Sequence, residues 1–190
     1  LDTKAEKIKD ARMRLVYNML LAVAAVPGLL FFLLKMLFTG KYRHSFLQKL
    51  GARQDHLPAG IAPGRRVWVH AVSVGEVTAA APVVAALKAK RPDVRIIFST
   101  STETGQGMAQ RLVRGADAFI YFPLDLPFSV GHMLDVVRPE VFVLVETELW
   151  PNFLAACRRR NISAVMVNGR LSPRSFSRYR RTRFFWRQVL

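Results

Sequence analysis

The chain has 190 residues, a formal net charge of +16 and one cysteine, Cys157. This length suits one ordinary domain with an extra segment, and a domain of ~150 residues buries a substantial core. The single cysteine excludes an internal disulfide framework and a cysteine metal cluster, and the aromatic content of 11% excludes a largely disordered chain. The positive charge points to nucleic acid or an anionic membrane surface as a partner.

The amino-terminal part of the chain is hydrophobic. Residues 15–34 carry no charge, and at ~1.5 Å per residue a helix over them matches the ~30 Å hydrocarbon core of a bilayer. We therefore predict a membrane-anchor helix over residues 13–38, with a signal peptide and a buried core helix as the alternatives. The charge-free run contributes nothing obvious to a parallel sheet, so we expect the α/β domain to stay folded when residues 13–38 are deleted. Residues 1–12 are a polar leader, interpreted as a tag or an upstream extension.

The rest of the chain alternates between two kinds of segment. Residues 39–64 are punctuated by glycine and proline and are predicted to be a connector. Short apolar runs rich in β-branched residues then predict strands over residues 67–71, 94–98, 118–122, 141–145 and 164–167. The helix-like stretches between them cover residues 77–90, 105–113, 127–137 and 152–160. This alternation predicts an α/β domain over residues 65–190, with a parallel, Rossmann-like sheet covered by helices on both faces.

Polar side chains follow the predicted strands at their carboxyl ends, the edge where open α/β sheets bind ligands. The sequence there is HAVSVGE after the first strand, STSTETG after the second, ETELWPN after the fourth and NGRLS after the fifth. These hydroxyls, carboxylates and amides suit a polyhydroxylated or phosphorylated ligand. The dinucleotide motif G-x-G-x-x-G, the P-loop and the hydrolase motif G-x-S-x-G do not occur.

Each of these clusters also has a purely structural interpretation. Glu76 is typical of an acidic residue in the first turn of a helix, and residues 99–104 are typical of a helix N-cap region. A strand-like backbone would point the carboxylates of Glu146 and Glu148 the same way, and such a like-charged pair is harder to explain by structure alone. His70 is expected to be a packing or hydrogen-bonding residue, because four histidines are too few for a convincing metal site.

Five motifs occur in a characteristic order. They are HAVSVGEV over 70–77, STSTETG over 99–105, FPLDLP over 122–127, ETELWPN over 146–152 and NGRLSPRS over 168–175. Through them, residues 13–190 resemble the amino-terminal half of the 3-deoxy-D-manno-octulosonic acid (Kdo) transferases of lipopolysaccharide biosynthesis. Gly169 and Pro173 depart from the family's more frequent NARLSERS.

The resemblance implies the amino-terminal half of a two-domain glycosyltransferase of the GT-B type. In this family, the amino-terminal domain receives the lipid A precursor and the carboxyl-terminal domain binds the sugar donor CMP-Kdo. The chain resembles only the acceptor half, so we expect it to be inactive without the donor domain. The implied reaction is the transfer of Kdo from CMP-Kdo to the lipid A precursor (lipid IVA), and no metal or cofactor is expected.

The resemblance also implies roles for individual residues. Glu76 is expected to be the general base that takes a proton from the acceptor hydroxyl. The residues expected to bind substrate are Ser73, Gly75, Ser99, Thr100, Ser101, Thr102, Thr104, Glu146, Glu148, Asn168 and Arg170.

The positive charge is concentrated near the carboxyl terminus. Between Leu149 and Leu190 there is no acidic residue, and the arginines are Arg158, Arg159, Arg160, Arg170, Arg174, Arg178, Arg180, Arg181, Arg183 and Arg187. A solvated basic tail with affinity for nucleic acid is one interpretation. Next to a membrane anchor, anionic lipid head groups and lipid A phosphates are the more economical partners. Residues 178–186 mix cations with aromatics, as an interfacial segment does.

The resemblance, together with the predicted anchor, implies a location at the inner membrane with the catalytic domain on the cytoplasmic face. Nucleic acid is not expected as a partner. Two alternatives remain open at the level of sequence. One is another GT-B glycosyltransferase acting on a lipid-linked acceptor. The other is a non-enzymatic membrane module that binds anionic lipid or nucleic acid.

Overall fold

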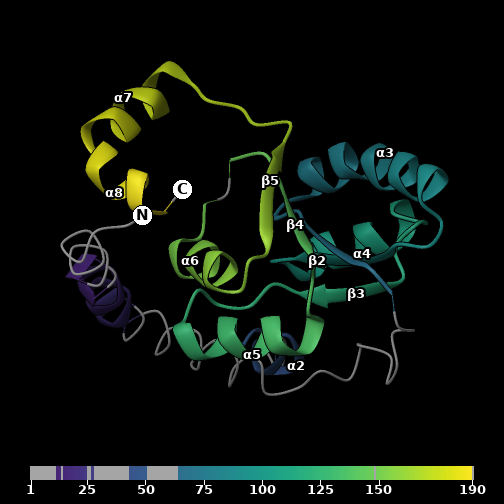
Figure 1. The fold of residues 1–190 in the computed structure, drawn as a ribbon, viewed down its shortest axis with the longest axis horizontal. Helices are drawn as coiled ribbons and strands as arrows, with labels where there is room; N and C mark the ends of the chain where they lie inside the picture. The colour runs from purple at the N-terminus through teal and green to yellow at the C-terminus, as the bar shows by residue number, and fades with distance from the viewer. Residues whose placement is uncertain are drawn as a thin grey trace.

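The computed structural model describes residues 12–13, 15–24, 27, 43–50, 64–147 and 149–189. Its centre is a five-stranded sheet with the order β3-β2-β1-β4-β5 (Figure 1). The strands are β1 Arg66–His70, β2 Arg95–Thr100, β3 Ala118–Tyr121, β4 Val141–Val145 and β5 Ser163–Val167. Neighbouring strands all pair in parallel. The predicted parallel α/β fold and its five strands are therefore confirmed.

Helices cover both faces of the sheet. They are α2 Arg43–Lys49, α3 Val74–Lys90, α4 Glu103–Leu112, α5 Pro127–Val137, α6 Pro151–Arg159, α7 Pro173–Arg181 and α8 Arg183–Val189. α3 and α4 pack on one face and α5 and α6 on the other (Figure 1). The four helices predicted between the strands are confirmed. α3 begins three residues earlier than predicted because Ser73, and not a later residue, is its N-cap.

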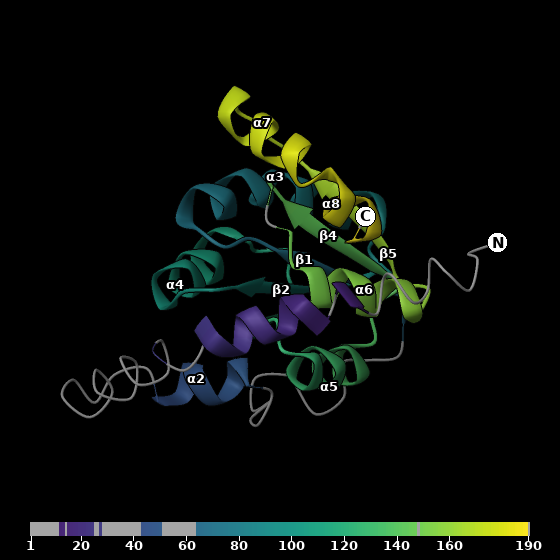
Figure 2. The same cartoon turned by 90° about the vertical axis from the view of Figure 1, so that its left-hand side faces the viewer.

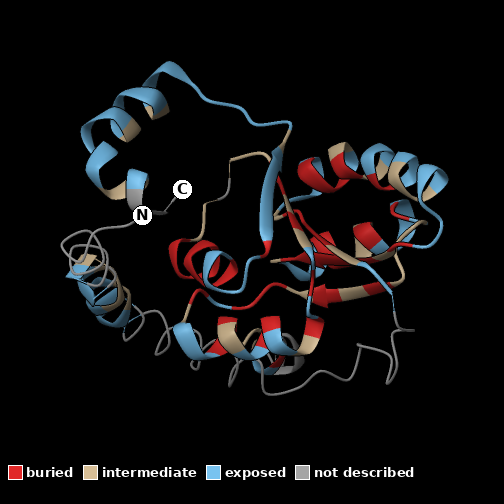
Figure 3. Ribbon diagram, viewed as in Figure 1, coloured by how far each residue is buried: buried red, intermediate tan, exposed pale blue. Residues whose placement is uncertain are grey.

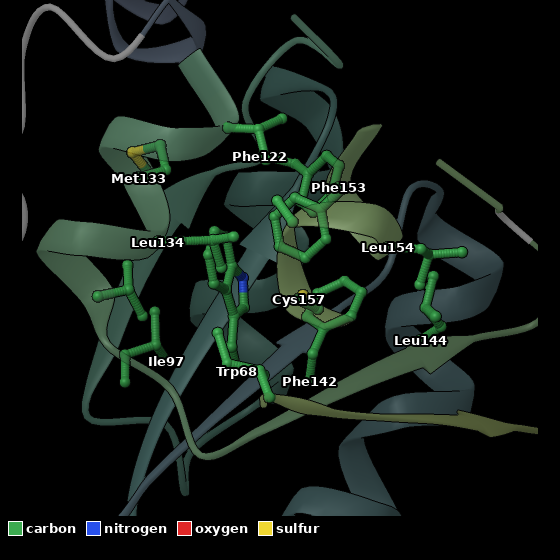
Figure 4. Close-up of a cluster of buried hydrophobic side chains, with 14 of the residues drawn as sticks. Trp68, Ile97, Phe122, Met133, Leu134, Phe142, Leu144, Phe153, Leu154 and Cys157 are labelled. Atoms are coloured by element: carbon green, nitrogen blue, oxygen red, sulfur yellow. The ribbon is translucent and has the colours of Figure 1, made fainter. Parts of the chain in front are cut away.

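Alternating side chains of β1 enter two separate cores. Trp68 is fully buried on the α5–α6 face, and its ring packs edge-to-face on Phe142 and Phe153 at centroid distances of 5.8 and 5.1 Å (Figure 4). Val69, the next residue, is buried on the α3–α4 face. This period of two is the side-chain alternation of a strand, and burial on both faces explains why the strands read as continuous apolar runs.

Residues 15–24 are helical and contact the α/β domain. Figure 2 shows this helix in purple beside α6. The Tyr17 hydroxyl donates to Asp125 Oδ2 at 2.8 Å, and Asn152 Nδ2 donates to Asn18 Oδ1 at 2.7 Å. Two polar side chains of this segment are therefore hydrogen-bonded to the domain, although neither core cluster includes a described residue of the segment. That the domain folds without the segment stays a prediction.

The membrane anchor predicted over residues 13–38 is not found as such. Of that range, residues 14, 25–26 and 28–38 lie outside the described residues. Among the described helices, none combines the length and the apolar character needed to cross a bilayer.

α2 lies within the segment that was predicted to be a connector. Its Lys49 carbonyl accepts hydrogen bonds from Leu124 N at 2.9 Å and Ser129 Oγ at 2.6 Å, and Lys49 Nζ lies 5.4 Å from the ring centroid of Tyr121. A helix can form here because the glycines and prolines of the segment flank RHSFLQK and do not interrupt it. Residues 39–42 and 51–63 lie outside the described residues.

β5 is an exposed edge of the sheet. Its residues are pale blue in Figure 3, and the side chains of Val165 and Met166 are 46% and 41% exposed. The central strands β1, β2 and β4 are mostly buried, as the red ribbon shows.

Candidate functional site at the carboxyl edge of the sheet

The polar clusters that follow the strands meet at one edge of the sheet. His70, the last residue of β1, is in register with Ser99 near the end of β2 and with Leu144 near the end of β4. Because the strands are parallel, the loops after β1, β2, β4 and β5 all leave from this edge. The predicted convergence is confirmed.

Ser73 and Glu76 form a reciprocal cap at the start of α3. Ser73 Oγ donates to Glu76 Oε1 at 2.9 Å and accepts from Glu76 N at 3.4 Å, while Val72 N donates to Glu76 Oε2 at 2.7 Å. A Ser at the N-cap with a Glu three residues later is the capping-box pattern. The structural interpretation of Glu76 as a first-turn acid is therefore confirmed.

The position of Glu76 fixes its carboxylate in one orientation. The residue is 6% exposed and belongs to α3, whereas the predicted helix began only after it. Each of its carboxylate oxygens accepts one of these two hydrogen bonds and has capacity for another, because a carboxylate offers about four acceptor positions. Glu76 can therefore serve as a cap and still accept a proton or a hydroxyl hydrogen bond.

The hydroxyl cluster after β2 divides into a buried and an open part. Ser99 and Thr100 are fully buried, and β2 extends through both of them. Ser99 Oγ accepts from Trp68 Nε1 at 2.7 Å, and Thr100 Oγ1 donates to Gln106 Oε1 at 2.8 Å. The expected substrate-binding role is not supported for Ser99 and Thr100, because both hydroxyls are hydrogen-bonded inside the core.

The open part of the cluster begins at Ser101, which is half-buried, and continues with the exposed Thr102 and Thr104. Thr102 is the N-cap of α4, where its hydroxyl accepts from Gly105 N at 3.0 Å. A Cβ on Gly105 would lie 3.5 Å from the Val72 carbonyl oxygen, so α4 starts close to the loop after β1. The loop that carries these three hydroxyls therefore leaves the same edge of the sheet as the loop that leads to the Ser73–Glu76 cap.

His70 has the packing role expected of it. Its Nδ1 lies 2.9 Å from Ser99 Oγ, and its ring stacks on Phe122 at a centroid distance of 3.8 Å. Complete burial lowers the pKa of His70 to about 3, because the charged imidazolium loses its hydration. The imidazole is therefore neutral at physiological pH and belongs to the core.

The loops after β4 and β5 are joined to each other. Thr147 Oγ1 donates to the Arg170 carbonyl at 2.6 Å and accepts from Arg170 N at 3.2 Å. Arg170 Nε also lies 3.9 Å from Glu146 Oε1. Glu146 and Asn168, the first residues after the two strands, both have a left-handed backbone, with φ of 63° and 53°. A glutamate in this conformation is strained, and such strain is concentrated at functional sites.

The prediction that Glu146 and Glu148 point the same way from an extended backbone is wrong at Glu146. The strand ends at Val145, and the positive φ of Glu146 turns the chain away from the extended course. Glu148 lies outside the described residues. Gly75, Asn168 and Arg170 are exposed at the edge where the sequence placed them.

Asp125 is a buried, multiply hydrogen-bonded carboxylate that was not predicted as a site residue from the sequence. It is 4% exposed, and its carboxylate accepts from Asn152 N at 3.0 Å, Phe153 N at 2.8 Å and the Tyr17 hydroxyl at 2.8 Å. It thus caps α6, whose own N-cap residue Trp150 makes no side-chain bond. Burial raises the pKa of Asp125 to about 6, against the opposing effect of these hydrogen bonds. The sequence signal that could have identified Asp125 is that it is the only charged residue in the otherwise apolar motif FPLDLP.

The carboxyl edge of the sheet carries a carboxylate, hydroxyls and a guanidinium. Among the residues that the structure describes, no three His, Cys, Asp or Glu side chains are arranged to hold a metal ion. The chemistry that these groups support is the binding of a hydroxylated, anionic ligand together with uptake of a proton.

Comparison with known proteins gives these residues a context. Residues 42–190 match the family model described as 3-deoxy-D-manno-octulosonic-acid transferase (kdotransferase). The chain is 36% identical over 166 residues to the 3-deoxy-D-manno-octulosonic acid transferase of Haemophilus influenzae, which covers 87% of this chain and 38% of that protein. It is 31% identical over 177 residues to the transferase of the same name from Chlamydophila psittaci, with 90% of this chain and 40% of that protein covered.

A plant protein is similar as well. The probable mitochondrial 3-deoxy-D-manno-octulosonic acid transferase of Arabidopsis thaliana is 32% identical over 127 residues, which are 67% of this chain and 28% of that protein. The chain thus spans two fifths or less of the length of these curated relatives.

Proposed function

The chain belongs to the 3-deoxy-D-manno-octulosonic acid transferase family, and we propose that it is the acceptor-binding part of an enzyme that transfers Kdo from CMP-Kdo to the lipid A precursor. The single observation that carries this proposal is the orientation of the Glu76 carboxylate at the carboxyl edge of the sheet. The sugar donor is bound by a part of the enzyme outside this chain, which spans 38% of the Haemophilus influenzae relative.

In the proposed reaction, Glu76 acts as the general base. The acceptor hydroxyl oxygen attacks the anomeric carbon of Kdo, its proton passes to Glu76, and the bond from that carbon to the CMP phosphate oxygen breaks, so that CMP leaves with the bonding electrons. A base must lie within hydrogen-bond distance of the hydroxyl that it deprotonates. The bonds from Val72 N and Ser73 Oγ support this role, because they hold the carboxylate in place before substrate arrives.

Neighbouring groups are suited to orient the two sugars. Ser101, Thr102 and Thr104 offer hydroxyls in the loop after β2, at the same edge of the sheet as Glu76. Arg170 offers a guanidinium that matches phosphate or carboxylate oxygens in a bidentate manner. The left-handed backbone at Glu146 and Asn168 supports a functional role for the loops that carry them.

We also place the enzyme at the cytoplasmic face of the inner membrane, in contact with anionic lipid. The arginines of α7 support this, because Arg174, Arg178, Arg180 and Arg181 are all exposed. Within the described part of the chain none of the four has a carboxylate partner, so their charges are available to lipid phosphates.

The test is the change Glu76→Gln in the full-length enzyme, assayed with CMP-Kdo and the lipid A precursor. We expect transfer to fall by about a hundredfold or more, the range attributed to a general base. Gln can still accept the hydrogen bond from Val72 N, so the fold should persist, as circular dichroism would report. Retention of a substantial part of the parent rate would remove Glu76 from the catalytic role.

Two controls separate the base from the cap. Ser73→Ala removes the capping hydroxyl and one of the two bonds that orient the carboxylate, but keeps the carboxylate and its bond from Val72 N. It should cost about 1 kcal/mol of stability and lower transfer far less than Glu76→Gln does. Glu140→Gln removes an exposed acid at the amino end of β4, where it pairs with Arg65, and should leave transfer unchanged. If Ser73→Ala lost as much activity as Glu76→Gln, helix capping would explain the effect.

A further inference from the structure

A cavity of about 690 Å³ lies between the helical residues 15–24 and the α7–α8 pair. This volume is in the range of ~300–1,000 Å³ that is typical of small-molecule sites. Its walls are largely apolar and include Val16, Leu20, Phe185 and Trp186, with Arg178 among the lining residues. The cavity shares no lining residue with the strand-end cluster around Glu76. A ligand bound in the cavity therefore does not contact the proposed general base through these residues.

The apolar walls of this cavity are open to water. Val16 is 56% exposed, Leu20 is 65% exposed and Phe184, which also lines the cavity, is 57% exposed. Apolar side chains that are exposed and line one cavity offer a surface on which an apolar ligand can bind. Its covering by hydrocarbon would be favourable, because apolar surface would leave water.

The back of the cavity is held in place by the rest of the fold. The Tyr17 ring lies 6.1 Å from that of Phe185, and the Tyr17 hydroxyl is bonded to Asp125 in the domain. Trp186 packs edge-to-face on Phe185 at 5.1 Å, and its Nε1 donates to Thr182 Oγ1 at 3.1 Å. Because α8 also contacts α6, both walls of the cavity are attached to the domain.

Charge indicates the chemistry of the occupant. Arg178 lines the cavity and, among the described residues, has no carboxylate partner; Arg174 and Arg181 are exposed on the same helix. No acidic residue occurs between Leu149 and Leu190. A second copy of this chain would bring the same uncompensated arginines to the site, so charge complementarity favours an anionic occupant over self-association.

We propose that this cavity holds one alkyl chain of a phosphate-bearing membrane lipid, with the chain against Val16, Leu20 and Trp186 and the phosphate at Arg178. This rests on the proposed contact of the enzyme with anionic lipid and gives that contact a specific site; it does not depend on sugar transfer, since it requires only binding.

The first measurement uses dodecyl phosphate, below its critical micelle concentration, titrated calorimetrically into the 190-residue chain. We expect one molecule per chain. Each methylene removed from the chain should weaken binding about fourfold, the ratio that corresponds to ~0.8 kcal/mol per CH₂. Octyl phosphate should thus bind about two-hundredfold more weakly, and inorganic phosphate should show no comparable affinity. Equal affinities of dodecyl phosphate and inorganic phosphate would overturn the proposal in favour of a simple anion site.

Two variants locate the binding. Val16→Trp fills the cavity and should weaken dodecyl phosphate binding at least tenfold, whereas Met19→Trp, 62% exposed on the same helix and outside the cavity lining, should not. Arg178→Gln should weaken dodecyl phosphate at least tenfold and leave dodecanol unaffected, with Arg174→Gln as its matched control. Because Arg178 is exposed, this variant tests the proposal even if Val16→Trp fails to fold.

Fluorescence quenching shows which tryptophan lies next to the alkyl chain of the bound ligand. A dodecyl phosphate brominated on its chain should quench tryptophan fluorescence in the parent, and Trp186→Phe should remove that quenching, because Trp68 is buried in the core and neither Trp68 nor Trp150 lines the cavity. Quenching that persists without Trp186, or a dimer that Val16→Trp dissociates, would contradict the proposal; the transfer assay is not involved in either result.

Discussion

Asp125 connects three parts of the chain through one carboxylate. It accepts from the first turn of α6 through Asn152 N and Phe153 N, and from the amino-terminal helix through the Tyr17 hydroxyl. Its folded-state pKa of about 6 lies above the ordinary value of 3.8 because the group is buried. The folded state therefore binds this proton more tightly than the unfolded state does. Its contribution to stability is fully present below pH ~4 and is lost as the pH rises through about 6.

The size of the pH effect on stability follows from the difference between the folded and the unfolded pKa of Asp125. Two pKa units correspond to about 3 kcal/mol. We predict that the difference in free energy of unfolding between the parent and Asp125→Asn falls by about that amount between pH 4 and pH 7, because Asn does not titrate. Urea unfolding at the two pH values measures it. A difference that is independent of pH would show that Asp125 titrates normally.

Asp117 provides the control with the opposite sign. Burial would raise the pKa of Asp117, but hydrogen bonds from Lys88 at 2.8 Å, Ile96 N at 2.8 Å and Arg95 at 3.0 Å outweigh it and lower the pKa. Its contribution is present above the unfolded pKa and is lost as the pH falls. The parent should therefore gain stability relative to Asp117→Asn as the pH rises through the unfolded pKa of about 3.8.

Sequence alone predicts local contacts at the residue scale and misses those between distant segments. The serine and glutamate of SVGE stand three apart, so a cap could be expected from their spacing. The burial of Ser99 and Thr100 was missed because polar side chains were taken to mark the end of the strand, while Trp68 and Gln106 provide partners inside the core. Asp125 caps a helix that begins 26 positions later in sequence, at Pro151, and no spacing rule indicates that pairing.

At the scale of elements, the basic carboxyl-terminal segment consists of the two short helices α7 and α8. The arginines of α7 face solvent, whereas two aromatic residues of α8 are partly buried. The α7 arginines are exposed, as predicted for an interfacial segment. Phe185 and Trp186 are only partly exposed, because they pack on each other and on Tyr17 and Tyr179. Phe184, 57% exposed, is the aromatic residue of this group that is most open to a membrane surface.

We predict that changing Arg178, Arg180, Arg181 and Arg183 together to Gln weakens binding to anionic vesicles. At roughly 1 kcal/mol for each basic residue near an anionic leaflet, three engaged arginines change the affinity by about a hundredfold. Co-sedimentation with vesicles that contain lipid A precursor, compared with neutral vesicles at low and high salt, measures this.

The matched control removes four exposed arginines from other elements, namely Arg65, Arg91, Arg111 and Arg114. It should bind anionic vesicles nearly as well as the parent. If the α7–α8 variant bound vesicles normally and lost affinity for RNA, the membrane interpretation of this segment would be wrong.

For the whole molecule, the alternation of apolar runs and helix-like stretches was sufficient to predict the sheet and the helices that cover it. The runs are unbroken because both faces of β1, β2 and β4 are buried. The same pattern could not place the amino-terminal helix, whose docking depends on two polar residues, Tyr17 and Asn18, inside an apolar run.

We predict that deleting residues 1–38 lowers the free energy of unfolding by about 1–3 kcal/mol, since the hydrogen bonds of Tyr17 and Asn18 are lost and Asp125 loses one of its three bonds. Unfolding should stay cooperative, because the two core clusters lie entirely within residues 67–167. Chemical denaturation measures both. Unchanged stability would mean that the helix contributes nothing, and loss of the cooperative transition would mean that it belongs to the core.

The reaction rate of the chain's single thiol, Cys157 in α6, reports how often the domain opens. Cys157 is 1% exposed within α6, and burial raises its pKa to about 12, so that almost no thiolate exists in the folded state at pH 8. A disulfide reagent should therefore modify the native protein only as fast as α6 is released. We expect the urea dependence of labelling to match that of unfolding followed by tryptophan fluorescence. Rapid labelling without denaturant would reveal that α6 opens independently of the sheet.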